Sequence, residues 1–446
     1  LQGSIMFLYK KIHILIWSVC IVLVFFIWPL KLNYDGSNYL MIMSLKDDYY
    51  FPHLRFSNYI TEFIPLFILK YFTDFKLYAS SFFLGYTVLY AVLSLYVMFV
   101  IRNSILSFIM LFLYLFAAPF THFFAVTEIL MAATVSILSL SILLSDKFGG
   151  YKKWIFLTLL SIYLFGLHPL ANGILAWVLF TLLIIENKVK VKERIAFMVL
   201  NSSLLVLRYF MRTPYEIRKS NPSEAVQNDM FNSLINFLEQ FLIIELPYIV
   251  FTILLIFLSF KYKDPKKWTK FLLFLSSVTS FSFIVFYSNF PINHVGTFEN
   301  LLLPIWIFII TLYLSTLKEL LEDKVKRYFF IIIFFVSSYS SYRVFNYGLP
   351  IYNVFKKEMA EIDKAILEGK TVVYLSGEDP QYDDLGGDTP FKSLLLSNAY
   401  YNKSVLLMHK TKTKRAKFFS KFGINTKYLS EFEIYKWGEE VRKKDV

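Results

Sequence analysis

Long apolar segments recur along most of this 446-residue chain and constrain its fold more than any other feature. A helix needs about 20 apolar residues to cross the hydrocarbon core of a bilayer, and most of the segments approach that length. Only 18% of the residues are charged, below the level of about 25% that is usual in soluble domains. These features predict an all-α polytopic membrane protein of about eleven transmembrane helices, at 12–30, 79–101, 105–120, 127–145, 154–168, 170–186, 195–210, 241–260, 270–288, 298–317 and 328–345.

Basic residues are distributed unevenly over the loops between these segments, and this distribution predicts the orientation. Cytoplasmic loops of membrane proteins carry an excess of Lys and Arg. With the N-terminus in the cytoplasm, the short outer connections at 121–126, 168–169 and 289–297 contain no Lys or Arg. The abundance of Lys, Ile, Phe and Asn is typical of AT-rich bacterial genomes, so we expect a multi-pass protein of the bacterial cytoplasmic membrane. The inner loops contain Lys147, Lys152 and Lys153; Lys188, Lys190, Lys192 and Arg194; and Lys261, Lys263, Lys266, Lys267 and Lys270.

One further apolar segment, 59–73, is interrupted by Glu62, Pro65 and Lys70. A helix of about 14 residues reaches only about 21 Å, less than the roughly 30 Å of the hydrocarbon core. Counting this segment as a span would also move the basic loops to the outer side. We therefore expect a helix that lies in the outer interface, inside a long first outer loop at 31–78.

The C-terminal part of the chain, 346–446, differs in character from the rest. The segments TVVYLS, PFKSLLLSNAYY, KSVLLMH and TKRAKFFSKF alternate between strand-like and helix-like patterns. They predict a small α/β domain, which the parity of the spans places outside the cytoplasm. Residues 6–345 would form the transmembrane domain, and we interpret residues 1–5 as the remnant of a cleaved tag before Met6.

Ionisable residues gather at the outer ends of the expected spans, and such groups at membrane depth usually mark a water-filled site. Asp35 directly follows the first span, where a carboxylate could act as general base towards a hydroxyl, although Asp-Gly is also a common turn. In the same loop, Arg55 suits a phosphate through its forked donors but equally suits a lipid headgroup. His53 is a further candidate for substrate binding, and Asp47 and Asp48 could hold a divalent cation or form a solvated pair.

Later outer ends contribute further candidates. Glu128 opens an otherwise apolar span, so it needs a partner or a cavity unless the helix dipole accounts for it, and we treat it as a second catalytic carboxylate. His168 precedes Pro169 and could belong to a site or only to a turn. Arg208 could clamp a phosphate or extend to lipid headgroups. The expected substrate-binding residues are His53, Arg55, His122, His168, Arg208, Arg212, His294 and Glu299.

Several motifs of known chemistry do not occur. The sequence contains no Walker loop, no G-x-G-x-x-G after a strand, no H-E-x-x-H and no paired C-x-x-C. An ATP-driven pump and a dinucleotide enzyme are therefore disfavoured, and no cofactor is expected beyond a divalent cation. The net charge of +13 does not indicate nucleic acid as a partner, because the positive residues follow the membrane topology.

The layout resembles that of the GT-C superfamily of integral membrane glycosyltransferases, which use lipid-linked sugar donors. In this family a long outer loop follows the first span, carries an acidic catalytic residue near its start and includes a helix along the membrane. Asp35 and the segment 59–73 match these features, and Glu128 corresponds to a second acidic residue from the next outer loop. The segment FENLLLP at 298–304 resembles the RYLLP-type start of a late span, but Glu-Asn replaces the Arg-Tyr pair.

The resemblance implies the inverting transfer of a sugar from a polyprenyl phosphate to an extracytoplasmic glycan, lipid or protein. Asp35 would activate the acceptor hydroxyl, while Arg55, Arg208, Arg212 and the outer histidines would stabilise the departing lipid phosphate. A transporter or flippase of lipid-linked glycans or small molecules, and a polysaccharide polymerase, remain alternatives. Transporters usually contain internal repeats and helices broken near the midplane, and this sequence contains no such repeat.

Overall fold

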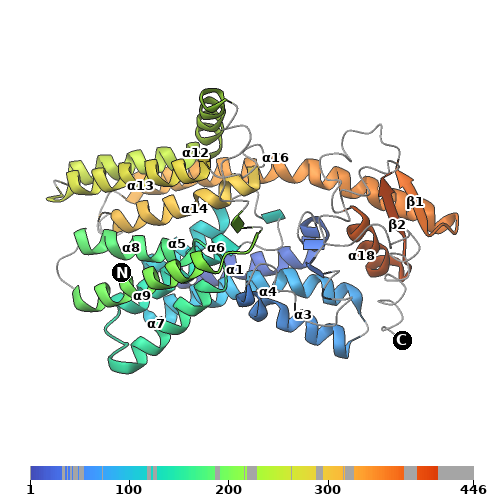
Figure 1. Cartoon of the computed structure of the whole chain (residues 1–446), viewed down its shortest axis with the longest axis horizontal. Coiled ribbons are helices and arrows are strands. Elements are labelled where there is room, and N and C mark those ends of the chain that lie inside the picture. Colours follow the sequence, from blue (N-terminus) through green and yellow to red (C-terminus); the bar gives the residue numbers. More distant parts are fainter. Residues whose placement is uncertain are drawn as a thin grey trace.

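The computed structural model describes residues 2–32, 36–37, 39–40, 43, 49, 55–72, 74–117, 122–123, 128–185, 191–214, 216–217, 229–262, 264–287, 295–314, 316, 326–375 and 389–409. Helices account for nearly all of this described chain, in agreement with the expected all-α fold. Most of them run side by side along the long axis of the molecule, and a small unit with two strands lies at one end (Figure 1).

A helix is present at each of the eleven apolar segments. The first half contains α1 (Gln2–Ile27), η1 (Trp28–Leu32), η3 (Phe56–Asn58), α3 (Tyr59–Tyr71), α4 (Phe75–Tyr96), η4 (Val97–Ile101), α5 (Ser104–Phe112), η5 (Leu113–Ala117), α6 (Glu128–Leu144), α7 (Gly150–Phe165), α8 (Ala171–Ile185) and α9 (Val191–Phe210). The second half contains α12 (Met230–Lys261), α13 (Lys267–Tyr287), α14 (Val295–Leu312), α16 (Lys326–Leu367), β1 (Val372–Leu375), α18 (Thr389–Tyr401) and β2 (Leu406–His409).

Length and composition identify some of these helices as membrane spans. Within the described residues, Lys10–Leu32, Lys76–Ile101 and Lys267–Phe286 are long and apolar enough to cross a bilayer. A fourth span is added if the two arms of α12, which bend by 71°, count as one. Other apolar helices, such as Glu128–Leu144, are shorter. The structure therefore supports an association with membranes, and the count of eleven spans stays a prediction.

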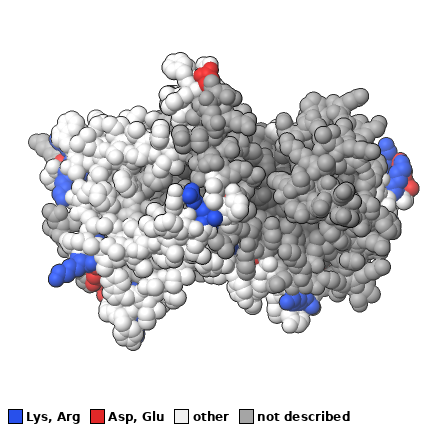
Figure 2. All heavy atoms as spheres, viewed as in Figure 1, with Lys and Arg blue, Asp and Glu red and all other residues white. Residues whose placement is uncertain are grey.

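The exposed surface of the helices is largely apolar, as a lipid-facing surface requires. Phe26, Phe210 and Phe257 are 72%, 78% and 61% exposed. Figure 2 shows mostly uncharged atoms on the visible flank of the described helices, with a few scattered charged side chains. A soluble monomer rarely exposes such extensive apolar surface, because its contact with water is unfavourable.

Buried polar side chains join helices that are far apart in sequence. His13 of α1 shares hydrogen bonds with Ser94 of α4 at 2.9 Å and with Ser107 of α5 at 3.1 Å. Asn172 of α8 donates to Asn201 of α9 at 2.9 Å. Lipid solvates apolar side chains as well as other helices do, so helix association in a bilayer depends on close packing and on hydrogen bonds of this kind.

At the end of the bundle with the basic loops, lysines bind carbonyl groups of neighbouring helices. The last four carbonyl groups of a helix have no partner within it. Lys153 of α7 donates to Leu143 O, near the end of α6, at 2.9 Å. Lys266 donates to Ile185 O, the last carbonyl of α8, at 2.5 Å. The lysines whose distribution predicted the orientation thus also donate hydrogen bonds to carbonyl groups at the C-terminal ends of apolar helices.

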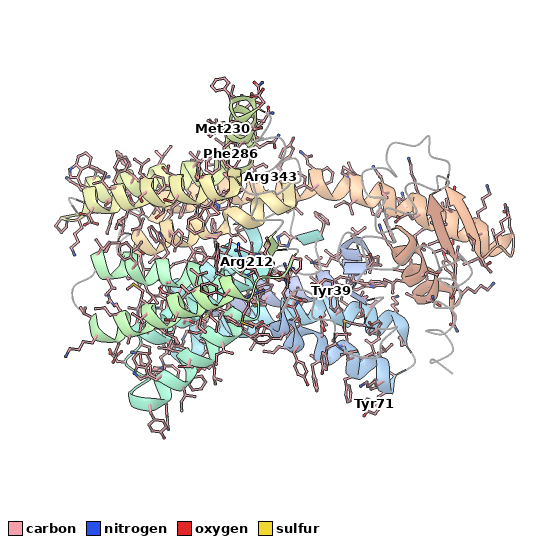
Figure 3. All side chains as sticks on the ribbon, viewed as in Figure 1. Tyr39, Tyr71, Arg212, Met230, Phe286 and Arg343 are labelled. Atoms are coloured by element: carbon pink, nitrogen blue, oxygen red, sulfur yellow. The ribbon has the colours of Figure 1, made fainter. Side chains whose placement is uncertain are left out.

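The bend in α12 lies at Pro247, between its arms 230–246 and 248–261. Proline has no N–H group, and its ring displaces the carbonyl group four residues earlier. Tyr339 of α16 donates to that carbonyl, Ile243 O, at 3.2 Å, and Arg343 donates to the next one, Ile244 O. Figure 3 labels Arg343 where α16 passes below the arm of α12 that contains Met230. Side chains of α16 therefore replace the bonds that the bend removes.

Helix α16 has 42 residues and continues through the boundary at 345/346 that the sequence predicted. At 1.5 Å per residue its length is about 63 Å, twice the thickness of a hydrocarbon core. Its first part lies beside α12 and its last part reaches the strand-containing unit (Figure 1). A single helix therefore connects the membrane-like bundle to the C-terminal unit.

The C-terminal unit contains the first three elements that the sequence predicted, a strand, a helix and a second strand. Strands β1 and β2 are parallel, with Val372 paired to Leu406, and α18 provides the crossover that parallel strands require. A buried ion pair, Lys392 to Glu358 at 2.7 Å, fastens α18 to α16. The ring of Tyr400 also stacks on Trp28, which docks α18 on the end of η1. The expected fourth element lies outside the described residues, so a complete α/β domain stays a prediction.

Two single-cysteine variants test the predicted orientation in a Cys20→Ala background. Lys152, at the start of α7, and Lys364, near the end of α16, are both exposed and lie at opposite ends of the molecule. We expect a membrane-impermeant maleimide to label Lys364→Cys on intact cells, and to label Lys152→Cys only after permeabilisation. Labelling of Lys152→Cys on intact cells would show that the true orientation is the reverse of the predicted one.

Candidate functional site

The start of α3 is anchored to the C-terminal end of α7. Ser57 donates through its backbone N–H to Gly166 O at 3.1 Å and through its hydroxyl to Tyr163 O at 2.5 Å. A Cβ atom at Gly166 would lie 2.4 Å from the ring of Phe56, so a larger residue there would displace that ring. These contacts fix the short turn η3 and, with it, the preceding residue Arg55.

Arg55 forms an ion pair with Glu128, the first residue of α6. Arg55 Nη1 and Glu128 Oε2 are 2.6 Å apart, and the two side chains are 17% and 7% exposed. Glu128 also lies at a helix N-terminus, where the helix dipole favours a negative charge. The prediction that Glu128 needs a partner is confirmed, and the partner is another predicted site residue from a different part of the chain.

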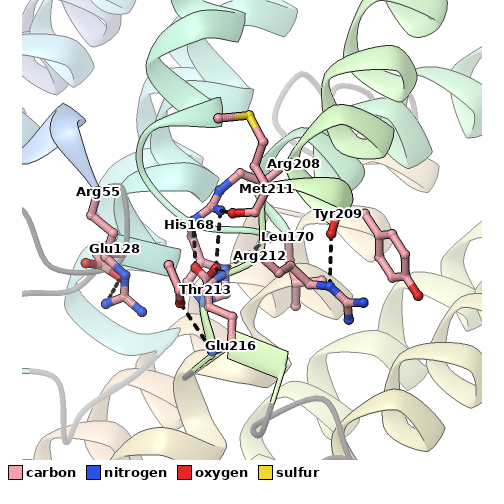
Figure 4. A network of polar contacts seen from close by, with 10 residues as sticks. All are labelled: Arg55, Glu128, His168, Leu170, Arg208, Tyr209, Met211, Arg212, Thr213 and Glu216. Atoms are coloured by element: carbon pink, nitrogen blue, oxygen red, sulfur yellow. Dashed lines mark hydrogen bonds and ion pairs between the residues drawn. The ribbon is translucent and has the colours of Figure 1, made fainter.

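His168 lies in the turn between α7 and α8, within electrostatic range of Arg55 and Arg208 (Figure 4). Its Nδ1 atom accepts a hydrogen bond from Leu170 N at 3.2 Å. Burial and the positive charges of Arg55 and Arg208 lower the pKa of His168 to about 3. The imidazole is therefore neutral near pH 7, with its proton on Nε2 and that N–H group able to donate.

Arg208, in the last turn of α9, is buried against Glu216. Its Nη1 and Nη2 atoms lie 3.2 and 2.6 Å from the two carboxylate oxygens of Glu216. The same carboxylate accepts a hydrogen bond from Thr213 N at 2.9 Å, and Thr213 Oγ1 accepts one from Glu216 N at 3.4 Å. This reciprocal pair is a capping box, followed by Pro214 at the first helical position. Sequence reasoning did not select Glu216, although the T-P-x-E pattern could have indicated it.

Arg212 belongs to the same turn as Thr213 but has a different environment. Its Nε atom donates to Tyr209 O at 3.0 Å, and its guanidinium group lies 3.6 Å from the centre of the Tyr209 ring. That ring is 58% exposed. The position of Arg212 therefore fits contact with a lipid headgroup better than contact with the buried group around His168.

The inner face of α3 adds polar groups that sequence reasoning did not place in the site. Glu62 and Asn58 are 0% and 1% exposed, whereas Phe63 on the outer face is 52% exposed. Glu62 and Glu128 both lie within electrostatic range of the buried Tyr86 of α4. The structure confirms a helix at the segment 59–73, although it ends at Tyr71. Its polar side faces the protein and its apolar side faces outward, as expected for a helix in a membrane interface.

His122 has a different set of neighbours from His168. Its Nε2 atom lies 3.1 Å from Leu115 O, and its ring meets that of Tyr114 edge to face. Burial and the positive charge of Lys31 lower its pKa to about 4, against the opposing effect of the Leu115 carbonyl. Lys31 was not selected from the sequence, although its position between the first span and Asp35 was a signal.

The remaining predicted residues cannot be placed in this arrangement. Asp35, Asp47, Asp48, His53 and His294 lie outside the described residues. Glu299 belongs to α14, but its side chain is not among those described. Among the described residues, no group of three or more His, Cys, Asp or Glu side chains could hold one metal ion. The divalent cation therefore stays an expectation that concerns Asp47 and Asp48.

Comparison with known proteins adds no relative: no family model, no curated protein and no solved structure matches the chain. The chemistry of the site is therefore inferred from its own residues. Two guanidinium groups, each paired with a carboxylate, lie within electrostatic range of a neutral imidazole whose Nε2–H group can donate. Such an arrangement is suited to an anion, since guanidinium and imidazole N–H groups both donate to phosphate or carboxylate oxygens.

Replacement of Glu216 by Gln tests the buried ion pair. The change leaves the positive charge of Arg208 buried without its counter-charge, which we expect to cost about 3 kcal/mol of stability. In detergent, this variant should unfold at a clearly lower temperature than the wild type. Arg212→Gln is the matched control, because it removes a stacked and exposed guanidinium group from the same turn and should cost less than about 1 kcal/mol. Equal losses in the two variants would contradict the interpretation.

The depressed pKa of His168 predicts a dependence of stability on pH. Histidine in an unfolded chain titrates near 6.5, whereas folded His168 titrates near 3. Stability is thus present above about pH 6.5 and is lost as the pH falls towards 3, by on the order of 1–2 kcal/mol at about pH 5. The unfolding temperature should fall less on acidification in His168→Asn, whose amide oxygen can still accept from Leu170 N. Parallel pH profiles for the two proteins would contradict this prediction.

Proposed function

We propose that this protein is an inverting glycosyltransferase that moves a sugar from a polyprenyl phosphate to an acceptor on the extracytoplasmic side of a bacterial cytoplasmic membrane. One observation carries the proposal. Arg55, which is paired with Glu128, and Arg208 come from separate segments of the chain, and both lie within electrostatic range of His168. The acceptor belongs to the class of extracytoplasmic glycans, lipids or proteins.

The proposed role of the arginines is to stabilise the leaving group. When the bond between the sugar and the phosphate breaks, the lipid phosphate gains negative charge, which fixed donors stabilise in a buried site. Arg55 and Arg208 supply positive charge, and the Nε2–H group of neutral His168 supplies a further donor. None of these groups has to release a proton, since a phosphate is a good leaving group without protonation.

The proposed roles of the carboxylates differ. Glu128 is 2.6 Å from Arg55, so its role in the proposal is to position that guanidinium group rather than to accept a proton from the acceptor. Asp35 remains our candidate for the general base that activates the acceptor hydroxyl. Attack by that hydroxyl without a glycosyl-enzyme intermediate would invert the anomeric carbon.

The bend in α12 favours a second candidate function, the transport of lipid-linked glycans. Transporters use helices broken within the membrane, with polar groups at the break. Glu245 adjoins the bend, is fully buried and accepts a hydrogen bond from Trp306 at 2.9 Å. A transporter would bind a lipid-linked glycan and move it without breaking the bond to phosphate, so release of polyprenyl phosphate distinguishes the two functions.

The experiment is an assay of purified protein in detergent with radiolabelled polyprenyl-phosphate sugars and candidate acceptors. We expect the wild type to release polyprenyl phosphate, and Asp35→Asn to reduce the rate by about 10²- to 10⁴-fold. Arg55→Gln should also lower turnover. Lys152→Gln, at the opposite end of the bundle, is the control and should retain full activity, and unfolding temperatures verify that each variant is folded.

Three outcomes separate the parts of the proposal. If the wild type binds lipid-linked sugars without cleaving them, the transporter becomes the better conclusion. If Asp35→Asn is fully active, the enzyme class stands and the assigned base is wrong. If Arg55→Gln is folded and fully active, the assignment of the phosphate site to this cluster is wrong.

A further inference from the structure

A pocket of about 430 Å³ lies at the end of the bundle that carries the basic loops, away from the site described above. It is formed where η4 leads into α5 and where α6 ends. Its polar lining consists of Arg102, Asn103, Ser141, Ser145, Asp146 and Lys147. The expected orientation places it on the cytoplasmic side of the membrane.

The backbone holds two cations at this pocket. Arg102 has φ 65° and ψ 36°. This left-handed backbone conformation is uncommon for residues other than glycine and is held by the surrounding structure. The next residue, Asn103, caps α5 by accepting a hydrogen bond from Leu106 N at 3.0 Å. Lys147 Nζ donates to Val100 O at 2.6 Å, which ties the loop after α6 to the end of η4. The tight turn and the cap together bring Arg102 beside Lys147.

Within the described part of the chain, neither cation forms an ion pair with a carboxylate. Other basic residues at this end have carboxylate partners: Lys153 lies 2.7 Å from Glu193, and Lys270 pairs with Asp264. Among the described residues, no hydrogen bond or ion pair engages the guanidinium group of Arg102, and no ion pair joins Asp146 to Arg102 or Lys147. Desolvation and, to a smaller extent, the nearby charge of Arg102 lower the pKa of the exposed Lys147. A bound anion would relieve the repulsion between the two cations.

The surface next to the pocket is apolar and exposed. Phe99 and Val100 are 42% and 45% exposed on the side of η4, and Lys10 lies 5.6 Å from the Phe99 ring. Two cations at a helix terminus therefore adjoin a strip of exposed hydrocarbon. A ligand that satisfies both surfaces carries an anionic group and an acyl chain.

We propose that this pocket binds the phosphate headgroup of an anionic phospholipid from the leaflet next to the basic end of the bundle. Arg102 contacts the phosphate oxygens through its forked N–H groups, and Lys147 adds a second charge. The acyl chains lie along Phe99 and Val100. Basic pockets between helices on the cytoplasmic side are suited to such headgroups. This site is independent of the glycosyltransferase proposal, because it involves none of the residues around His168.

The experiment titrates purified protein with lipid and counts bound molecules by native mass spectrometry. The ligands are phosphatidylglycerol, phosphatidylcholine with the same acyl chains, and inorganic phosphate. We expect phosphatidylglycerol to bind more tightly than phosphatidylcholine, and Arg102→Gln to weaken its binding by about fivefold. Lys152→Gln, which removes an exposed cation outside the pocket, should leave binding unchanged. Asp146→Asn removes a negative charge from the lining and should strengthen binding.

Several results would overturn the proposal. Equal binding of phosphatidylglycerol to the wild type and to folded Arg102→Gln excludes the pocket as the site. Equal binding of the two lipids excludes recognition of an anionic headgroup. Binding of inorganic phosphate that depends on Arg102, without binding of phosphatidylglycerol, excludes the lipid as the source of the anion. The predicted gain in Asp146→Asn cannot result from loss of folding, so its absence counts against the proposal even if Arg102→Gln is unstable.

Discussion

The need to find partners for carbonyl groups at the ends and breaks of apolar helices determines how this bundle is assembled. Lipid offers no hydrogen-bond donors, so each such group must be satisfied by the protein or lie where water reaches it. At one end of the bundle the donors are lysines; at the start of α3 the donor is Ser57; at the bend of α12 they are Tyr339 and Arg343. In each case the donor comes from a different element or loop than the helix that it completes. The hydrogen bonds that satisfy the carbonyl groups of one helix therefore also fix the position of a neighbouring segment.

The candidate site is a consequence of the same constraint. Ser57 bonds to the terminal carbonyl groups of α7, and this places Arg55 against Glu128. Burial of a guanidinium group is tolerated there because a carboxylate lies at hydrogen-bond distance. Arg208 and Glu216 repeat the arrangement, and Arg208 also lies within electrostatic range of His168. The site thus gathers guanidinium and imidazole N–H donors, with the charge of each guanidinium group balanced by a carboxylate, and this makes buried donors for an anion compatible with a stable fold.

Much of the helical framework and part of the site could be predicted from the sequence. Apolar length located the helices, and their expected outer ends grouped Arg55, Glu128, His168 and Arg208. The structure pairs Arg55 with Glu128 and places Arg55 and Arg208 within electrostatic range of His168. The continuation of α16 to Leu367 was missed because hydropathy reports contact with lipid, whereas a helix continues on propensity after it leaves the lipid. Glu216 was missed because its role depends on a local capping geometry, and the pairing of particular charges depends on tertiary packing that no local pattern contains.

The length of α16 has a mechanical consequence. The helix is fastened to the bundle through the carbonyl groups of α12 and to α18 through the ion pair of Lys392 with Glu358. It therefore acts as a lever with one attachment point on the helical bundle and the other on the C-terminal unit. A tilt of about 5° at one end of a rod of about 63 Å displaces the other end by about 5 Å. Docking of a macromolecule on the C-terminal unit would thus apply a torque to the bend in α12, far from the point of contact.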